Sequence, residues 1–90
     1  MTDRDKRIRS LLDSPGSSDR AQGIALLVMA HDFSSEFREI IGGFVNDDTP
    51  TSFHVPLSAL ARAYLIMSGD NALEADDRWT AYMLDSFKAA

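Results

Sequence analysis

The spacing of apolar residues along the chain indicates helices rather than strands. A first helix is expected over residues 3–13, with Thr2 as its N-cap, because three large side chains recur at intervals of three and four residues: Ile8, Leu11 and Leu12. This stripe is narrow, so we expect the helix to cover the core with one side only. Residues 14–18 contain a proline and a glycine, which predict a turn.

A second helix is expected after this turn, with Ser18 as its N-cap. Residues 24–30 are apolar at every position. Because successive residues of a helix are about 100° apart, such a run covers the whole circumference, and we expect this helix to be buried on all sides. His31 follows directly and is expected at the helix end, near free carbonyl groups.

A third helix is expected to begin after Ser34 or Ser35 and to end at the glycine pair 42–43, with Phe37, Ile40 and Ile41 as its apolar residues. Residues 44–55 then allow two interpretations. They form either a small β-hairpin around an Asp/Pro turn or an irregular loop. We expect residues 46–54 to be the most mobile part of the chain interior, because they are rich in turn formers and contain one large apolar anchor, Phe53.

Two further helices are expected in the second half of the chain. The fourth spans residues 57–67, where the only polar residues, Ser58 and Arg62, are four apart and therefore share one face. Arg62 is expected at the boundary of the core, paired with a carboxylate. A capping-box pattern, Asn71 with Glu74 three residues later, predicts that the fifth helix begins there and runs to about Phe87.

These elements predict an all-α fold, a compact bundle of four to five helices with, in one of the two interpretations above, a small β-hairpin at about 44–55. Ninety residues correspond to one domain, so we expect residues 1–90 to form a single helical domain. The longest apolar run has seven residues, whereas a membrane span needs about twenty. Residues 1–7 lack the apolar stretch of a signal peptide, so we expect a cytoplasmic protein without a membrane partner.

Charge is unevenly distributed along the chain. The net charge is −5, but residues 1–20 contain five basic and four acidic side chains, whereas residues 21–90 contain four basic and ten acidic ones. An acidic body repels phosphate backbones and favours basic protein surfaces. The charge pattern therefore predicts a protein partner with a basic surface and disfavours nucleic acid.

The sequence offers little for catalysis or cofactor binding. There is no cysteine, and the two histidines, His31 and His54, belong to no recognisable nucleophile or metal-ligand pattern. Adjacent aspartates such as Asp76 and Asp77 point apart on a regular element, so they do not form a catalytic pair. We therefore expect no enzyme activity, no cofactor and no metal.

Three functions fit this pattern. The first is a small acidic protein-binding domain, such as a regulatory subunit, adaptor or inhibitor, that acts without catalysis. An alternative is a nucleic-acid mimic whose carboxylates occupy the phosphate-binding groove of an enzyme. Another is a helix-turn-helix-like DNA-binding regulator formed by residues 24–41, although Glu36 and Glu39 outnumber Arg38 on its second helix.

The candidate contact residues are acidic or aromatic. Carboxylates would accelerate association with a basic partner, and apolar anchors would supply most of the affinity. The expected partner-binding set is Asp47, Asp48, Phe53, Asp70, Glu74, Asp76, Asp77, Trp79 and Tyr82. Two strongly apolar helices are difficult to bury in one small monomer, which also predicts a homodimer. Its expected contacts are Tyr64, Trp79 and Tyr82.

Overall fold

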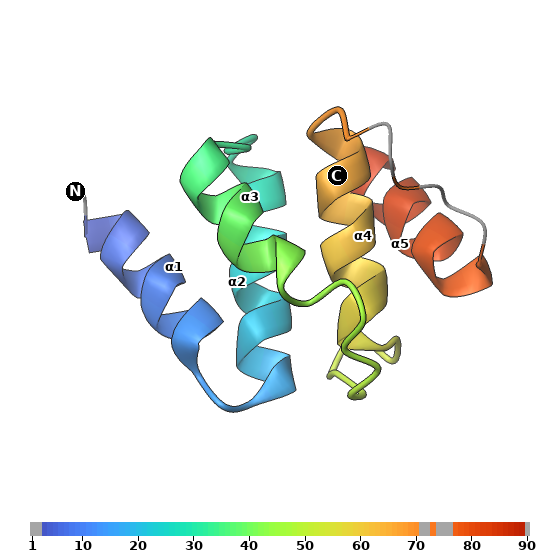
Figure 1. Ribbon diagram of the computed structural model, residues 1–90, viewed down its shortest axis with the longest axis horizontal. Helices are drawn as coiled ribbons and strands as arrows, with labels where there is room; N and C mark the ends of the chain where they lie inside the picture. The colour runs from blue at the N-terminus through green and yellow to red at the C-terminus, as the bar shows by residue number, and fades with distance from the viewer. Residues whose placement is uncertain (1–2, 71–72, 74–76, 90) are drawn as a thin grey trace.

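Five α-helices and their connections make up the computed structural model, which describes residues 3–70, 73 and 77–89 (Figure 1). No strand forms among these residues, so the protein is all-α, as the apolar spacing predicts. The Cα radius of gyration is 11.7 Å, close to the value of about 12 Å expected for a folded chain of this length. The helices are α1 (Asp3–Asp13), α2 (Ser17–Met29), α3 (Ser35–Gly42), α4 (Leu57–Met67) and α5 (Arg78–Ala89).

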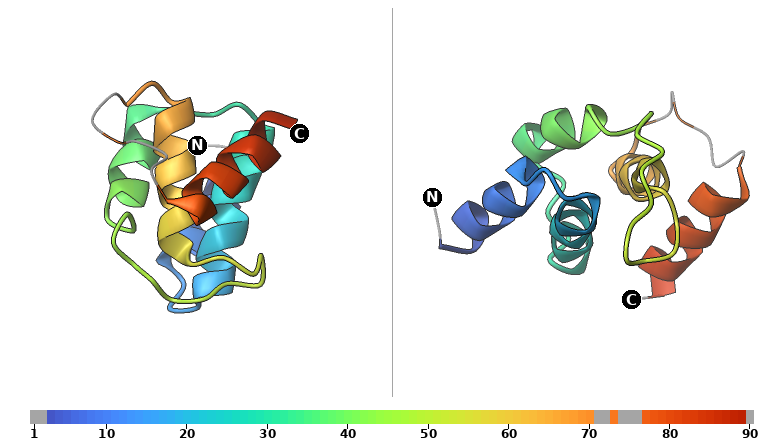
Figure 2. Two further views of the ribbon diagram at one scale, coloured as in Figure 1. Left: turned by 90° about the vertical axis from the view of Figure 1, so that its right-hand side faces the viewer. Right: turned by 90° about the horizontal axis from the view of Figure 1, so that it is seen from below.

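Helix α4 occupies the centre of the bundle. It packs most extensively against α5 and also against α2 and α3, while α1 packs on the far side of α2 (Figures 1 and 2). Eight of its eleven residues are buried, and the three others, Arg62, Ile66 and Met67, are partly buried. The prediction of a nearly all-apolar buried helix over residues 57–67 is therefore confirmed.

Helix α2 is only partly buried. Its side chains Ile24, Leu27 and Val28 belong to the core, but Ala25 is half-buried and Met29 is 69% exposed. The expectation that residues 24–30 are buried on all sides is wrong, because α4 takes the central position and leaves one face of α2 without a covering helix. The helix also begins two residues earlier than predicted: Gly16 is the N-cap, and the Ser18 hydroxyl instead accepts a hydrogen bond from the Ser52 N–H at 3.1 Å.

Two helices end in the same type of turn. At the end of α2 the His31 N–H donates to the Val28 carbonyl and the Asp32 N–H donates to the Leu27 carbonyl, the pattern of a Schellman motif. His31 takes the left-handed position with a φ of 52°. At the end of α4 the equivalent position is occupied by Gly69, with a φ of 99°. The prediction that His31 lies at a helix end is confirmed.

The segment between α3 and α4 is an irregular loop. It contains a single bridge, Pro50 to Pro56, and no strand, so of the two interpretations for residues 44–55 the hairpin is wrong. The loop is fixed to the start of α4, because the Ser58 N–H donates to the Asp47 carbonyl at 2.7 Å and the Leu57 N–H donates to the Thr49 carbonyl at 2.9 Å. The expected mobility of residues 46–54 stays a prediction.

Helix α5 begins later than the capping-box pattern predicts. Asn71 and Glu74 lie outside the described residues, but Leu73 is not helical and packs against the core. The N-cap is instead Asp77, whose carboxylate accepts hydrogen bonds from the Thr80 N–H at 2.9 Å and the Thr80 hydroxyl at 2.7 Å. The helix therefore starts at Arg78, with Asp77 satisfying one of its free N–H groups.

Candidate functional site

An apolar groove lies where α2 approaches α5. It has a volume of about 230 Å³, and Phe53 from the loop before α4 also contributes to its lining. It exists because the uncovered face of α2 lies beside α5 without filling the space between them. We call this feature the α2–α5 groove; it is lined by Ala25, Val28, Met29, Phe53, Tyr82, Met83, Ser86 and Phe87.

The large hydrophobic side chains that are exposed among the described residues lie in or next to this groove. They are Met29, Tyr82, at 58% exposed, and Trp79, at 39% exposed. Met29 and Tyr82 line the groove itself. Trp79 lies one helical turn before Tyr82 and lines a second, shallower depression with Pro50 and Pro56 of the loop. The two predicted aromatic contacts on α5 therefore lie on one continuous surface.

Arg62 joins the loop to the start of α5. Its Nε donates to the Val45 carbonyl at 2.8 Å, and its two terminal nitrogens lie 3.4 Å from the Asn46 amide oxygen and 3.5 Å from the Asp77 carboxylate. The predicted pairing of Arg62 with a carboxylate is confirmed. These contacts link the first residues of the loop to the start of α5.

Two of the predicted acidic contact residues are engaged within the chain. Asp47 accepts hydrogen bonds from the Thr49 hydroxyl and N–H and lies 3.7 Å from Arg20; the hydroxyl contact contributes most to lowering the pKa of Asp47. Burial acts to raise the pKa of Asp77, but the hydrogen bonds from Thr80, together with the charge of Arg62, outweigh it and lower that pKa. Both carboxylates therefore stabilise the fold, whatever they contribute to binding.

Of the other predicted acidic residues that the structure describes, Asp48 lies beside Asp47 in the loop, whereas Asp70 lies elsewhere. Asp48 is exposed and accepts a hydrogen bond from the Ser58 hydroxyl at 3.4 Å. Asp70 lies at the opposite end of α4, just after Gly69. Glu74 and Asp76 lie outside the described residues. The structure thus places Asp48 near the Trp79 depression and Asp70 away from it.

Tyr64 is a core residue rather than a surface residue. Its side chain is fully buried, its hydroxyl donates to the Asp32 carbonyl at 2.8 Å, and its ring lies 5.2 Å from the ring of Phe33. Burial raises the pKa of Tyr64 to about 12. The expectation of a dimer contact at Tyr64 is wrong, because the central position of α4 leaves none of this side chain at the surface.

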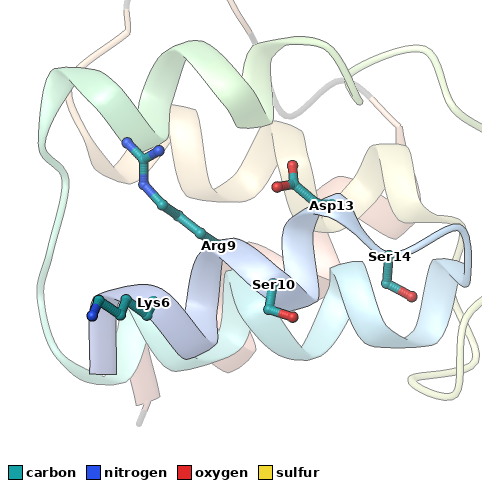
Figure 3. A pocket seen from close by; sticks show the side chains of 5 residues that line it. All are labelled: Lys6, Arg9, Ser10, Asp13 and Ser14. Atoms are coloured by element: carbon teal, nitrogen blue, oxygen red, sulfur yellow. The ribbon is translucent and has the colours of Figure 1, made fainter. Parts of the chain in front are cut away.

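A larger but more open hollow lies on the outer side of α1 (Figure 3). It has a volume of about 600 Å³ and is lined by Lys6, Arg9, Ser10, Asp13 and Ser14. Arg9 reaches toward α3, where it forms an ion pair with Glu36, and the Ser14 hydroxyl donates to Asp19 at 2.8 Å. The lining is polar and contains no large apolar side chain, so this hollow lacks anchors of the kind found in the α2–α5 groove.

Residues with catalytic or metal-binding chemistry are dispersed. Within the described part of the chain, no group of three or more histidine, cysteine, aspartate or glutamate side chains is placed to hold a metal ion. His31 and His54 are both exposed and both have positive φ angles, of 52° and 64°. Of the helices described, none is long and apolar enough to cross a membrane.

Sequence reasoning identified three members of this surface, Phe53, Trp79 and Tyr82, but missed the contribution of α2. Met29 is the largest omission, and Met83, Ser86 and Phe87 also line the groove. The sequence did indicate that an apolar face would remain open. Residues 24–30 and 57–67 both form strongly apolar helices, and only one of the two can be central in a small bundle. The chain matches no protein-family model, and comparison with curated proteins and with solved structures gives no significant match.

Proposed function

We propose that the protein is a binding domain that recognises another polypeptide through the α2–α5 groove and acts without catalysis. The observation that supports this most strongly is the grouping of Met29, Trp79 and Tyr82, the exposed large hydrophobic residues of the described chain, on one surface. Exposed apolar patches with a polar rim are typical of protein interaction sites. Aromatic residues at such sites commonly supply most of the binding energy.

The surroundings of the groove favour a partner with a cationic rim. Asp48 borders the Trp79 depression, and Asp85 is exposed on α5 one turn after Tyr82. The chain as a whole has a net charge of −5. Exposed charge pairs contribute only about 0–1 kcal/mol each, so the acidic rim would mainly accelerate association, while the apolar side chains would determine the lifetime of the complex.

Site-specific photo-crosslinking would test this proposal. A photoreactive amino acid is placed at Met29 or Tyr82 in cells that produce the protein, and at Ser10 on the outer side of α1 as the control position. We expect a distinct protein species to be crosslinked from the two groove positions and not from Ser10. Equal crosslinking from all three positions would contradict a specific role for the groove.

The purified partner is then titrated against three variants. Met29→Glu and Tyr82→Glu each add one negative charge to the groove, and Ser10→Glu adds the same charge to an exposed position of α1. Loss of a central hydrophobic contact of an interface costs at least about 2 kcal/mol, so we expect each groove variant to bind about thirtyfold more weakly. Unchanged affinity in both groove variants, with circular dichroism spectra like that of the parent, would refute the proposal.

A further inference from the structure

The outward face of α5 carries opposite charges on either side of an aromatic residue. Thr80, Met83, Leu84 and Phe87 point into the core. With about 100° between successive residues, Arg78, Tyr82 and Asp85 therefore form a line along the outer side, and all three are exposed. Figure 2 (left) shows α5 on the outside of the bundle, lying obliquely across α4 and α2. This face is available to a partner along the whole helix.

The order of residues on this face is self-complementary. In an antiparallel pair of identical helices related by a two-fold axis, residues at equal distances before and after the axis meet each other. The midpoint of Arg78 and Asp85 lies between Ala81 and Tyr82, so an axis there would bring each arginine to the aspartate of the other copy. The charges thus specify both the direction and the register of the pairing.

The sizes of the side chains favour the same antiparallel direction, with an axis close to that of the charged pair. Trp79 is the largest residue beside the groove, and Ser86, seven residues later, is a small residue that lines it. Their midpoint lies between Tyr82 and Met83, one residue from the midpoint of the charged pair. An antiparallel copy of α5 would therefore place its tryptophan over the serine end of the groove, beside Met29.

Arg78 is already held in a suitable position. Its guanidinium lies 4.4 Å from the centre of the Trp79 ring, a cation–π contact. Arg78 and Trp79 therefore present a positive charge next to a large apolar side chain. This is the kind of surface that the groove and its acidic rim favour in a partner. Asp85 is exposed and is available for the reciprocal contact.

We infer that α5 of a second copy of this chain packs antiparallel on the outward face of α5, about a two-fold axis near Tyr82 and along the edge of the α2–α5 groove, a pairing that rests on the proposed protein-binding function. In this dimer Arg78 of each copy pairs with Asp85 of the partner subunit, and Trp79 of each copy covers the groove of the other. Tyr82 lies at the centre, where a two-fold interface is most completely shielded from water.

The molar mass in solution is the first test. Sedimentation equilibrium across the micromolar range should show a shift from 9.9 kDa to twice that mass for the parent protein. Tyr82→Glu should remain at the monomer mass, and Ser10→Glu should dimerise like the parent. A parent protein that stays monomeric throughout would overturn the dimer. If the groove still captured another protein in the crosslinking experiment, the proposed function would survive that result.

Charge reversal tests the orientation. Arg78→Glu and Asp85→Arg each create two like-charge contacts in an antiparallel dimer, and we expect each to weaken dimerisation about tenfold. The double variant restores opposite charges at both contacts and should return the dissociation constant to within about threefold of the parent value. If the double variant is as weak as the single ones, the antiparallel arrangement is refuted. Retention of the parent circular dichroism spectrum by every variant is the check on folding.

Discussion

Gly23 lies where α1 and α2 approach each other closely. A Cβ atom at this position would lie 3.1 Å from Cδ2 and 3.2 Å from Cγ of Leu12, and 3.3 Å from Cβ of Leu11. Leu12 is almost completely buried, so its side chain has little room to rotate away. The Leu11 Cβ is bonded directly to the backbone of α1, so that contact can be relieved only by moving the helix itself.

We therefore predict that Gly23→Ala destabilises the protein. Alanine gains about 1 kcal/mol over glycine from helix propensity alone, but overpacking of a close contact typically costs about 1–3 kcal/mol. The net expectation is a loss of about 1 kcal/mol in the free energy of unfolding. For a domain of this size, that loss corresponds to a fall of about 4–8 °C in the melting temperature.

Gly42→Ala is the matched control. Gly42 is the last residue of α3, and a Cβ atom there would meet nothing within 4 Å. The same substitution should therefore raise the free energy of unfolding by about 0.5–1 kcal/mol. Thermal and urea unfolding followed by circular dichroism would measure both variants. If Gly23→Ala were stabilised as much as Gly42→Ala, the close approach would not constrain the packing of α1.

A double-mutant cycle identifies the responsible contact. Leu12→Ala removes the two atoms nearest to the added methyl group, so it should reduce the penalty of Gly23→Ala by at least about 0.5 kcal/mol, the usual scale for residues in contact. Strictly additive effects would show that the penalty arises elsewhere in the helix.

Three further predictions concern single side chains. The pKa of Asp77 is lower in the folded than in the unfolded state. Its contribution to stability is therefore complete above the unfolded pKa of about 3.9 and is lost as the pH falls through the folded-state pKa. In urea titrations below pH 4, the free energy of unfolding should fall less steeply with pH for Asp77→Asn than for the parent. His31→Gly should raise the free energy of unfolding by about 0.5 kcal/mol by relieving the positive φ, and a lower melting temperature would contradict this. Arg62→Met should cost about 1–3 kcal/mol, since the Val45 carbonyl loses its donor, and should accelerate hydrogen exchange in residues 46–54; unchanged exchange would refute the role of Arg62 in holding the loop.

The helices were predictable wherever local chemistry decides the structure. The apolar spacing predicted α1 and α4 with the observed bounds, and glycine or histidine after an apolar run indicated the helix ends. The start of α5 was not predictable in this way, because the chain contains two competing capping signals, at Asn71 and at Asp77. Leu73 packs against the core outside any helix, and Arg62 contacts Asp77, so tertiary contacts support the second signal.

The groove could not be located from the sequence for a related reason. Residues 24–30 and 57–67 are both apolar around most of their circumference, and nothing local indicates which helix becomes central. The structure places α4 in the middle, so Met29 is exposed and Tyr64 is buried. Helix periodicity therefore predicts how many apolar faces a chain must cover. Which of these faces remains open depends on how the helices are arranged in the bundle.

The central position of α4 also affects the order in which the chain can fold during synthesis. Helices α1 and α2 emerge first and can pair with each other, but the side of α2 that carries Ile24 and Leu27 needs α4 as its cover. Met67 is added 38 residues after Met29 (67 minus 29), which takes about 2–8 s at ordinary rates of translation. Helix α4 leaves the ribosome with the same delay after α2, and until then the side of α2 that it covers stays exposed.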